Sequence, residues 1–212
     1  GTLDDSKTHK LVLQGLFGTV NRVVSTKQLI DKKQLAQLKV MCLNLKYPEV
    51  EAKKVYGVKY FEELEFLTQN TARNKYIRNL ALALKGNTLL LFQLVEKHGE
   101  ILFNLIKEKA DPKRKVFFVY GGTETDDREK IRAITEKSDN AIIVASFGTF
   151  STGINIRNLH NIVFSSPTKS PIRVLQSIGR GLRVGDKKDS ATVYDISDDL
   201  TYKDKKNFTL TH

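Results

Sequence analysis

Short apolar runs alternate with longer amphipathic stretches along the chain from Thr88 onward. The short runs are typical of buried strands, and the charged stretches between them have the period of surface helices. This alternation predicts an α/β fold with a parallel sheet and helical crossovers. The predicted strands are Thr88–Phe92, Lys115–Tyr120, Ala141–Ala145, Asn161–Phe164 and Ala191–Ile196, and the predicted helices cover about Glu96–Lys109 and Asp126–Lys137.

The stretch before Thr88 is lysine-rich and less regular than the rest of the chain. Within it, apolar residues in Gln37–Tyr47 predict a long strand. Thr71–Leu84 predicts an amphipathic helix with Ile77 facing inward and Arg73 facing outward. We therefore expect an irregular connector over residues 1–70, one α/β domain over residues 71–200, and the start of a further segment over residues 201–212.

The formal charge of +11 favours a polyanionic partner over a protein that is merely basic and soluble. The single cysteine, Cys42, cannot form an internal disulfide, and the four histidines lack metal-ligand spacing. No apolar run reaches the roughly 18 residues that a membrane span needs, and the first residues do not resemble a signal peptide. We expect a soluble, cytoplasmic protein without a structural metal.

Ligands of parallel α/β sheets collect beyond the carboxyl ends of the strands, so the loops that leave each strand are candidate sites. Amides, short hydroxyls and glycines there suit contacts with a phosphate backbone. Lys97 and His98 are further candidates for an anion, and Phe147 and Phe150 fit either base stacking or core packing. The candidate nucleic-acid residues are Gln93, Gly121, Gly122, Thr123, Ser146 and Thr149.

The string QSIGRGLR, at residues 176–183, places two arginines three residues apart on one predicted helical face. Ser170 and Pro171 suit the start of that helix, and Gly185 suits its end. Arg180 and Arg183 then point the same way, while Gly179 lets a bulky group approach the backbone. Because a guanidinium matches phosphate oxygens, this helix is a candidate phosphate site.

Several ordered strings resemble motifs of the second RecA-like lobe of superfamily 2 helicases and translocases. FSTGIN at residues 150–155 resembles the fifth motif, QSIGRGLR the sixth, and TLLLFQ the fourth. The chain resembles the phage recombination helicases in particular. The resemblance rests on the strings FSTGI and NLH and on the spaced LQ, IGR and LR residues. GTLDD at residues 1–5 resembles the end of motif three, so residues 1–70 would include a remnant of the first lobe of a longer protein.

The resemblance implies roles for named residues. Arg180 and Arg183 would be arginine fingers on the γ-phosphate of ATP, and Gln176 would orient that site. Gly153, Asn155 and Gly179 would contact the nucleotide, although many members carry aspartate where this chain has Asn155. ATP and Mg²⁺ would be held mainly by the first lobe, because the 212 residues contain no GxxxxGK[ST] phosphate loop and no DEx[DH] motif.

The implied function is the C-terminal lobe of an ATP-dependent helicase acting on branched DNA in recombination or repair, inactive as an isolated chain. A nucleic-acid-binding module without motor activity, an RNA helicase lobe and a cofactor-binding α/β domain are the alternatives. The last would need a GxGxxG fingerprint after the first strand, and the only GxG here is Gly179–Gly181.

Overall fold

The computed structural model describes residues 7–19, 26–32, 35–153, 156–168, 170, 174, 176–179 and 190–203. Asn155, Arg180 and Arg183, which the sequence singles out, lie outside these residues.

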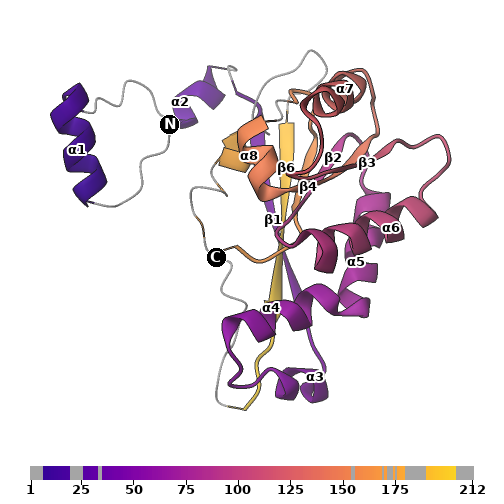
Figure 1. Ribbon diagram of the computed structural model, residues 1–212. Helices are drawn as coiled ribbons and strands as arrows, with labels where there is room; N and C mark the ends of the chain where they lie inside the picture. Colours follow the sequence, from indigo (N-terminus) through magenta and orange to yellow (C-terminus); the bar gives the residue numbers. More distant parts are fainter. Residues whose placement is uncertain are drawn as a thin grey trace.

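Six parallel strands form one sheet in the order β1-β6-β5-β2-β4-β3 (Figure 1). In-register pairs run through the sheet, such as Leu90 of β2 beside Val144 of β4 and Val163 of β5. The strands are β1 (Gln37–Lys46), β2 (Thr88–Phe92), β3 (Val116–Val119), β4 (Ile142–Ser146), β5 (Asn161–Phe164) and β6 (Ser190–Asp199).

Helices cover both faces of the sheet, as parallel strands with helical crossovers require. On one face, α5 (Thr71–Ala83) and α6 (Glu100–Lys109) pack on β2, β4, β5 and β6. On the other face lie α7 (Thr125–Glu136) and the short α8 (Phe147–Gly153). Alternate residues of one strand serve opposite faces, so Leu90 joins the first cluster and Leu89 the second.

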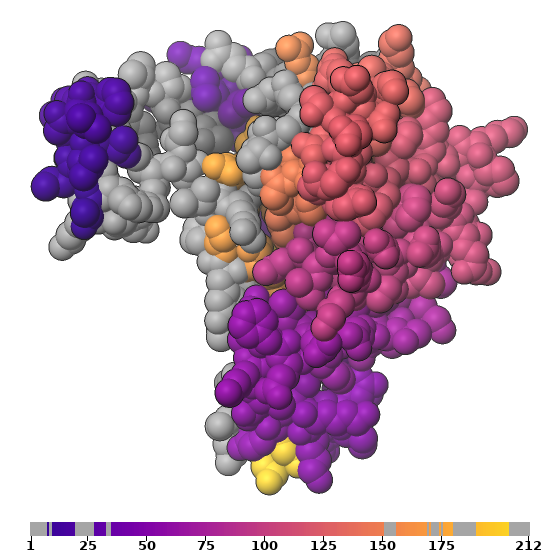
Figure 2. Space-filling model, in the orientation of Figure 1, coloured from indigo at the N-terminus to yellow at the C-terminus, as the bar shows by residue number. Residues whose placement is uncertain are grey.

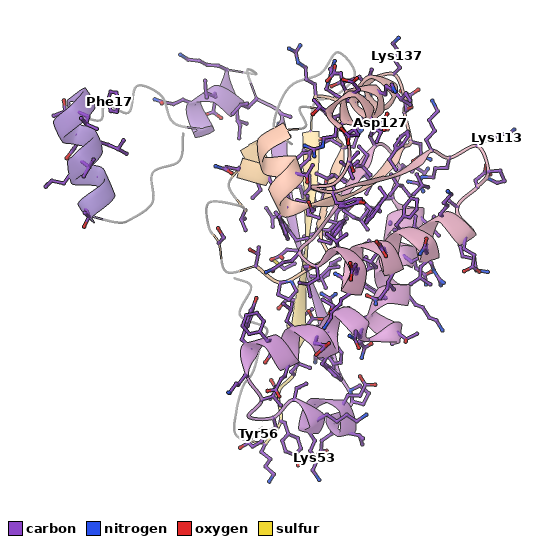
Figure 3. The ribbon with its side chains drawn as sticks, viewed as in Figure 1. Phe17, Lys53, Tyr56, Lys113, Asp127 and Lys137 are labelled. Atoms are coloured by element: carbon purple, nitrogen blue, oxygen red, sulfur yellow. The ribbon has the colours of Figure 1, made fainter. Side chains whose placement is uncertain are left out.

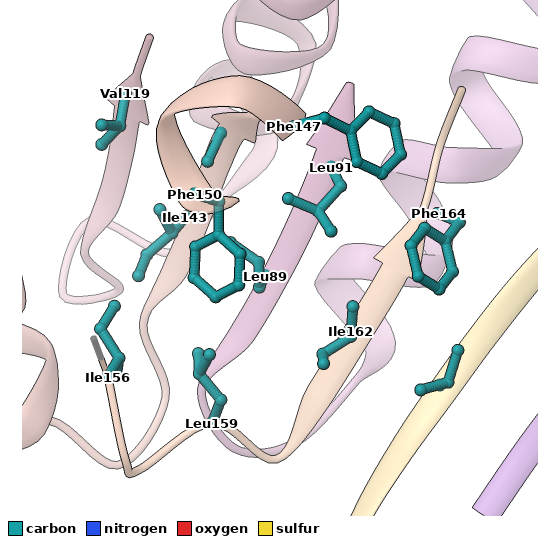
Figure 4. Packing of buried hydrophobic residues seen from close by; sticks show 12 residues of the cluster. Leu89, Leu91, Val119, Ile143, Phe147, Phe150, Ile156, Leu159, Ile162 and Phe164 are labelled. Carbon is teal, nitrogen blue, oxygen red and sulfur yellow. The ribbon is translucent and has the colours of Figure 1, made fainter. Parts of the chain in front are cut away.

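Two aromatic side chains of α8 complete the second cluster. Phe147 and Phe150 are 2% and 0% exposed, and Figure 4 shows them over the face that carries Leu89 and Ile143. The Phe147 ring stacks on Phe164 of β5 with centroids 5.9 Å apart. Of the two interpretations that the sequence left open for these rings, core packing is confirmed.

The first third of the described chain also contributes regular elements, namely α1 (Lys7–Phe17), α2 (Thr26–Asp31), β1, α3 (Glu49–Lys54) and α4 (Tyr60–Gln69). The ten residues of β1 pair in parallel with β6, so this strand is part of the sheet although it precedes the boundary predicted at residue 70. By contrast, α1 stands away from the sheet, with Leu11, Leu16 and Phe17 at least 70% exposed (Figures 1 and 2).

Three details differ from the sequence prediction. The helix expected from Glu96 begins as a π-helical turn, η1 (Val95–Gly99), before α6. The last strand, predicted to end at Ile196, extends to Asp199, so Asp198 also belongs to it. Arg73, predicted on the outer face of α5, is buried at 2% exposure. Among the described helices, none is long and apolar enough to cross a membrane.

Candidate nucleic-acid and nucleotide interface

The carboxyl ends of β2, β4 and β3 lie side by side because these parallel strands are neighbours in the sheet. Phe92, the last residue of β2, pairs with Ser146, the last residue of β4, so Gln93 and α8 leave the sheet at the same level. The loop Gly121–Thr123 follows β3, the next strand along. The structure thus brings the predicted nucleic-acid residues to adjacent strands at one edge.

Ser146 and Thr149 form a hydroxyl pair at the start of α8. Their Oγ and Oγ1 atoms are 2.8 Å apart, and the Thr149 N–H donates to Ser146 Oγ over 3.3 Å. Ser146 therefore caps the short helix in the way that serine commonly does. Thr149 is only 5% exposed, while Ser146 is half-buried. A ligand at this edge would meet Ser146 directly, with Thr149 behind it.

The loop after β3 is a tight turn with exposed backbone. The Tyr120 N–H donates to Thr123 Oγ1 over 3.0 Å, and the Thr123 N–H donates to the Tyr120 carbonyl over the same distance. Gly121 and Gly122 are exposed between them. A Cβ on Gly122 would come within 2.7 Å of the Tyr120 ring, whereas Gly121 has open space. The glycines thus keep the turn compact and its backbone open to a ligand.

Two acidic residues lie just beyond this turn. Asp126 and Asp127 occupy the first turn of α7, where carboxylates interact favourably with the helix dipole. The same charges oppose a phosphate at that helix end. An anion at this loop would therefore contact the glycine backbone in preference to the start of α7.

Gln93 connects two strand ends. Its backbone N–H donates to Ser166 Oγ over 3.1 Å, and Ser166 Oγ lies 2.8 Å from His98 Nδ1. The loops after β2 and β5 are therefore hydrogen-bonded to each other and to η1.

The prediction that His98 and Lys97 could reach an anion is wrong for His98. The imidazole is 0% exposed, and burial, aided by the nearby Arg73 charge, holds its pKa well below the usual range. The ring is therefore neutral near pH 7. Lys97 is exposed and its Nζ contacts Glu65 Oε1 at 2.7 Å.

A buried ion pair, which the sequence reasoning missed, lies at the start of α5. Arg73 Nε and Nη2 donate to the two Asp198 carboxylate oxygens at 2.8 and 3.0 Å, and Nη1 donates to the Ser165 carbonyl at 2.8 Å. The Tyr47 hydroxyl donates to Asp198 Oδ1 at 2.7 Å, and burial together with Asp198 raises the Tyr47 pKa above its usual range. This network joins the ends of β1, β5 and β6.

Part of the arginine-rich segment is anchored on the sheet. The Val174 N–H donates to the Ser170 carbonyl over 3.2 Å, which fits the predicted helix start at Ser170. Val174 and Ile178 pack against the cluster that contains Phe150, and Gln176 is half-buried. Gly179 is exposed, and a Cβ there would meet nothing within 4 Å.

Metal ligands are not assembled in the described part of the chain, where no group of three His, Cys, Asp or Glu residues could hold an ion. The chemistry that this edge offers is hydroxyl, amide and backbone hydrogen bonding, next to the segment that leads into the two arginines.

The family model of the helicase conserved C-terminal domain matches residues 72–185, more than half of the chain. The chain belongs to this helicase family. The matched region contains β2, β3, β4 and β5 and the loops that follow them.

Comparison with individual proteins gives the same family. The chain is 38% identical over 208 residues to the ATP-dependent DNA helicase uvsW of Enterobacteria phage T4, and the aligned region covers 97% of this chain and 41% of the phage protein. The crystal structure of T4 UvsW is similar with a TM-score of 0.68 and 39% identity, over 81% of this chain and 34% of that chain. The RecA-like fold and the helicase family predicted from the motifs are confirmed.

A more distant structure shares the fold alone. The DNA-bound restriction-modification enzyme LlaBIII matches the chain with a TM-score of 0.59 at 17% identity, over 85% of this chain and 13% of that chain. The chain spans about 41% of the length of the phage relative.

Proposed function

We propose that this chain is the second RecA-like lobe of an ATP-dependent DNA helicase or translocase that acts on branched DNA in recombination or repair. The observation that carries the proposal is the 38% identity to the phage DNA helicase across nearly the whole chain. The adjacent strand ends with Gln93, Gly121 and Ser146 support a grip on the sugar-phosphate backbone, which needs no particular base sequence.

Arg180 and Arg183 are the proposed catalytic residues of the lobe. When the lobes close on ATP, their guanidinium groups would stabilise the charge that develops on the γ-phosphate, with Gln176 orienting the site. Gly153, Asn155 and Gly179 would line the nucleotide, and the open space beside Gly179 fits a bulky anionic group there. ATP with Mg²⁺ supplies the driving reaction, and we assign most of its binding to the other lobe.

Movement along DNA follows from alternating grip by the two lobes. Closing and opening of the lobes would shift the strand held at the carboxyl edge by small steps. The isolated chain, which contains neither the phosphate loop nor the DEx[DH] motif, is proposed to hydrolyse no ATP by itself.

The test is DNA-stimulated ATP hydrolysis by the protein that contains both lobes, with wild type compared with Arg183→Ala. Loss of an arginine finger lowers turnover by about three to five orders of magnitude while binding to a branched DNA persists. Arg132→Ala is the matched control, because Arg132 is an arginine of α7 paired with Glu129.

If Arg183→Ala abolishes DNA binding and turnover per bound complex is unchanged, the helix is a nucleic-acid grip and the motor assignment fails. Stimulation of turnover by RNA in place of DNA would favour an RNA helicase lobe instead.

A further inference from the structure

An open groove of about 730 Å³ lies at the amino edge of the sheet, away from the carboxyl edge described above. It is formed by the chain entering β3, by the chain entering β4 and by Leu82 near the end of α5. Figure 3 shows Lys113 on the loop at the right of the molecule and Lys137 at its top, both extending outward from the surface. No helicase motif named above falls on these residues.

The groove is strongly basic. Its charged lining consists of five basic and two acidic residues, Lys109, Asp111, Lys113, Arg114, Lys115, Lys137 and Asp139, a formal charge of +3. The four lysines are exposed, and Lys109 contacts Glu108 at 3.0 Å, an exposed pair of little energetic weight. The 11 lining residues carry a formal charge of +3, whereas all 212 residues together carry +11, so positive charge is concentrated at the groove.

Arg114 forms the support of this groove. Its guanidinium donates to the carbonyls of Leu82, Leu84 and Asn140 at 2.7, 2.9 and 3.1 Å, which ties the end of α5 to the turn before β4. Partial burial lowers the Arg114 pKa from its usual value, but the group stays charged because an arginine does not lose its proton in proteins. The lysines therefore surround a fixed positive charge.

The shape and chemistry select the occupant. A small-molecule site is usually concave and mostly apolar, whereas this groove is open and lined almost entirely by polar residues. Lysine ammonium groups on flexible stems suit phosphates at variable positions. The lining contains no aromatic side chain on which unpaired bases could stack, so a duplex fits better than a single strand.

We infer that the lysine groove at the amino edge is a second nucleic-acid contact, which holds the phosphate backbone of a DNA duplex arm. The inference rests on the proposed DNA function and deepens it. Because the groove and the carboxyl edge are opposite edges of one sheet, a duplex arm at the groove would be separate from the strand gripped at the carboxyl edge. Two separate contacts of this kind suit a branched DNA, in which a single strand and a duplex arm meet.

The experiment compares the 212-residue wild-type chain with Lys113→Gln/Lys115→Gln/Lys137→Gln. The probe is a fluorescently labelled blunt DNA duplex, and the association constant is measured over a series of salt concentrations. Each lost phosphate contact makes the negative slope of log K against log salt concentration less steep by about 0.9. The slope of the triple variant should therefore be less negative than that of wild type by about two to three. Lys53→Gln/Lys54→Gln/Lys75→Gln removes the same charge from exposed lysines elsewhere and should keep the wild-type slope more closely.

Equal slopes for the groove variant and the control variant would overturn the inference. Lysine acetylation with and without the duplex gives a second measurement, in which Lys113, Lys115 and Lys137 should be protected. Full labelling of these lysines in the bound complex would also overturn it. If wild type binds neither duplex nor single strand, the nucleic-acid function fails together with the groove. If wild type binds DNA and the groove variant keeps the wild-type slope, the groove assignment fails while the nucleic-acid function stands.

Discussion

Arg73 places a guanidinium in the interior of the domain, where an unpaired charge is costly. The residue lies four positions before Ile77 and therefore on the same inward face of α5, a signal that helical spacing already contains. Its charge type nevertheless predicts an outward position. The partner, Asp198, is 125 positions away, and nothing in the local sequence connects the two. The residue scale is where sequence reasoning was weakest.

Removing one member of this pair should be far more costly than removing both. Arg73→Met leaves the buried Asp198 carboxylate without its guanidinium partner, so we expect a loss of about 3–5 kcal/mol in the free energy of unfolding. Arg73→Met combined with Asp198→Leu should recover much of that loss. Urea unfolding of the single and double variants measures both values.

An exposed ion pair provides the matched control. Lys130 contacts Asp127 at 3.0 Å on α7, with both side chains more than half exposed. Lys130→Met should cost less than about 1 kcal/mol because solvent screens the pair. A cost for Arg73→Met as small as this one would contradict the view that the buried pair holds the strand ends.

His98 should make the folded state sensitive to acid. Its folded pKa is lowered by burial, so the unfolded chain binds the proton first as the pH falls. The stability that the neutral His98 ring contributes to the folded state is complete above the unfolded pKa of about 6.5. Below that pH the free energy of unfolding declines by at most about 1.4 kcal/mol per pH unit. Unfolding free energies of wild type and His98→Gln, measured from pH 7 to pH 5, should converge as the pH falls. Parallel profiles would contradict a neutral buried imidazole.

At the scale of elements, apolar runs located five strands to within a few residues but could not order them. An apolar run such as β2 indicates that both faces of the strand are covered, but it does not indicate which strands pair with it. The long strand at Gln37–Tyr47 was also predicted, yet its pairing with β6 depends on contacts some 150 positions away along the chain. The predicted end of β6 was too early because the residues after Ile196 are polar, and the sequence does not show that Asp198 is buried against Arg73.

One glycine fixes the turn between α5 and β2. Gly86 has φ +86°, and a Cβ there would lie 2.7 Å from His160 Cγ. Gly86→Ala therefore combines backbone strain with a clash, and we expect a loss of about 1–3 kcal/mol. Gly57 has φ +78° with nothing within 4 Å, so Gly57→Ala measures the strain alone. Thermal and urea unfolding should rank Gly86→Ala as the more damaging change, and equal losses would exclude a role for His160.

For the molecule as a whole, composition predicted a polyanionic partner but not the place of the charge. The candidate residues at the carboxyl edge, such as Gln93 and Ser146, are uncharged, whereas the lysine groove lies at the amino edge. Net charge is a sum over the whole chain, and the position of each charged residue on the sheet is known only once the fold is known. The motifs, in contrast, identified the carboxyl edge directly, because loops that follow parallel strands must meet there.

The position of β1 leads to a prediction about where the domain begins. A chain that starts at residue 71 lacks β1. One side of β6 then becomes an exposed sheet edge, while β5 still pairs with the other side, and Asp198 loses the Tyr47 hydroxyl. A chain that starts at residue 35 keeps these contacts and loses α1, whose apolar side chains are exposed. We expect the chain 35–212 to unfold cooperatively with stability close to that of residues 1–212, and the chain 71–212 to aggregate or to unfold without a sharp transition. Urea unfolding with light scattering distinguishes them, and a cooperative, monomeric chain 71–212 would show that the domain begins at residue 71 as the sequence suggests.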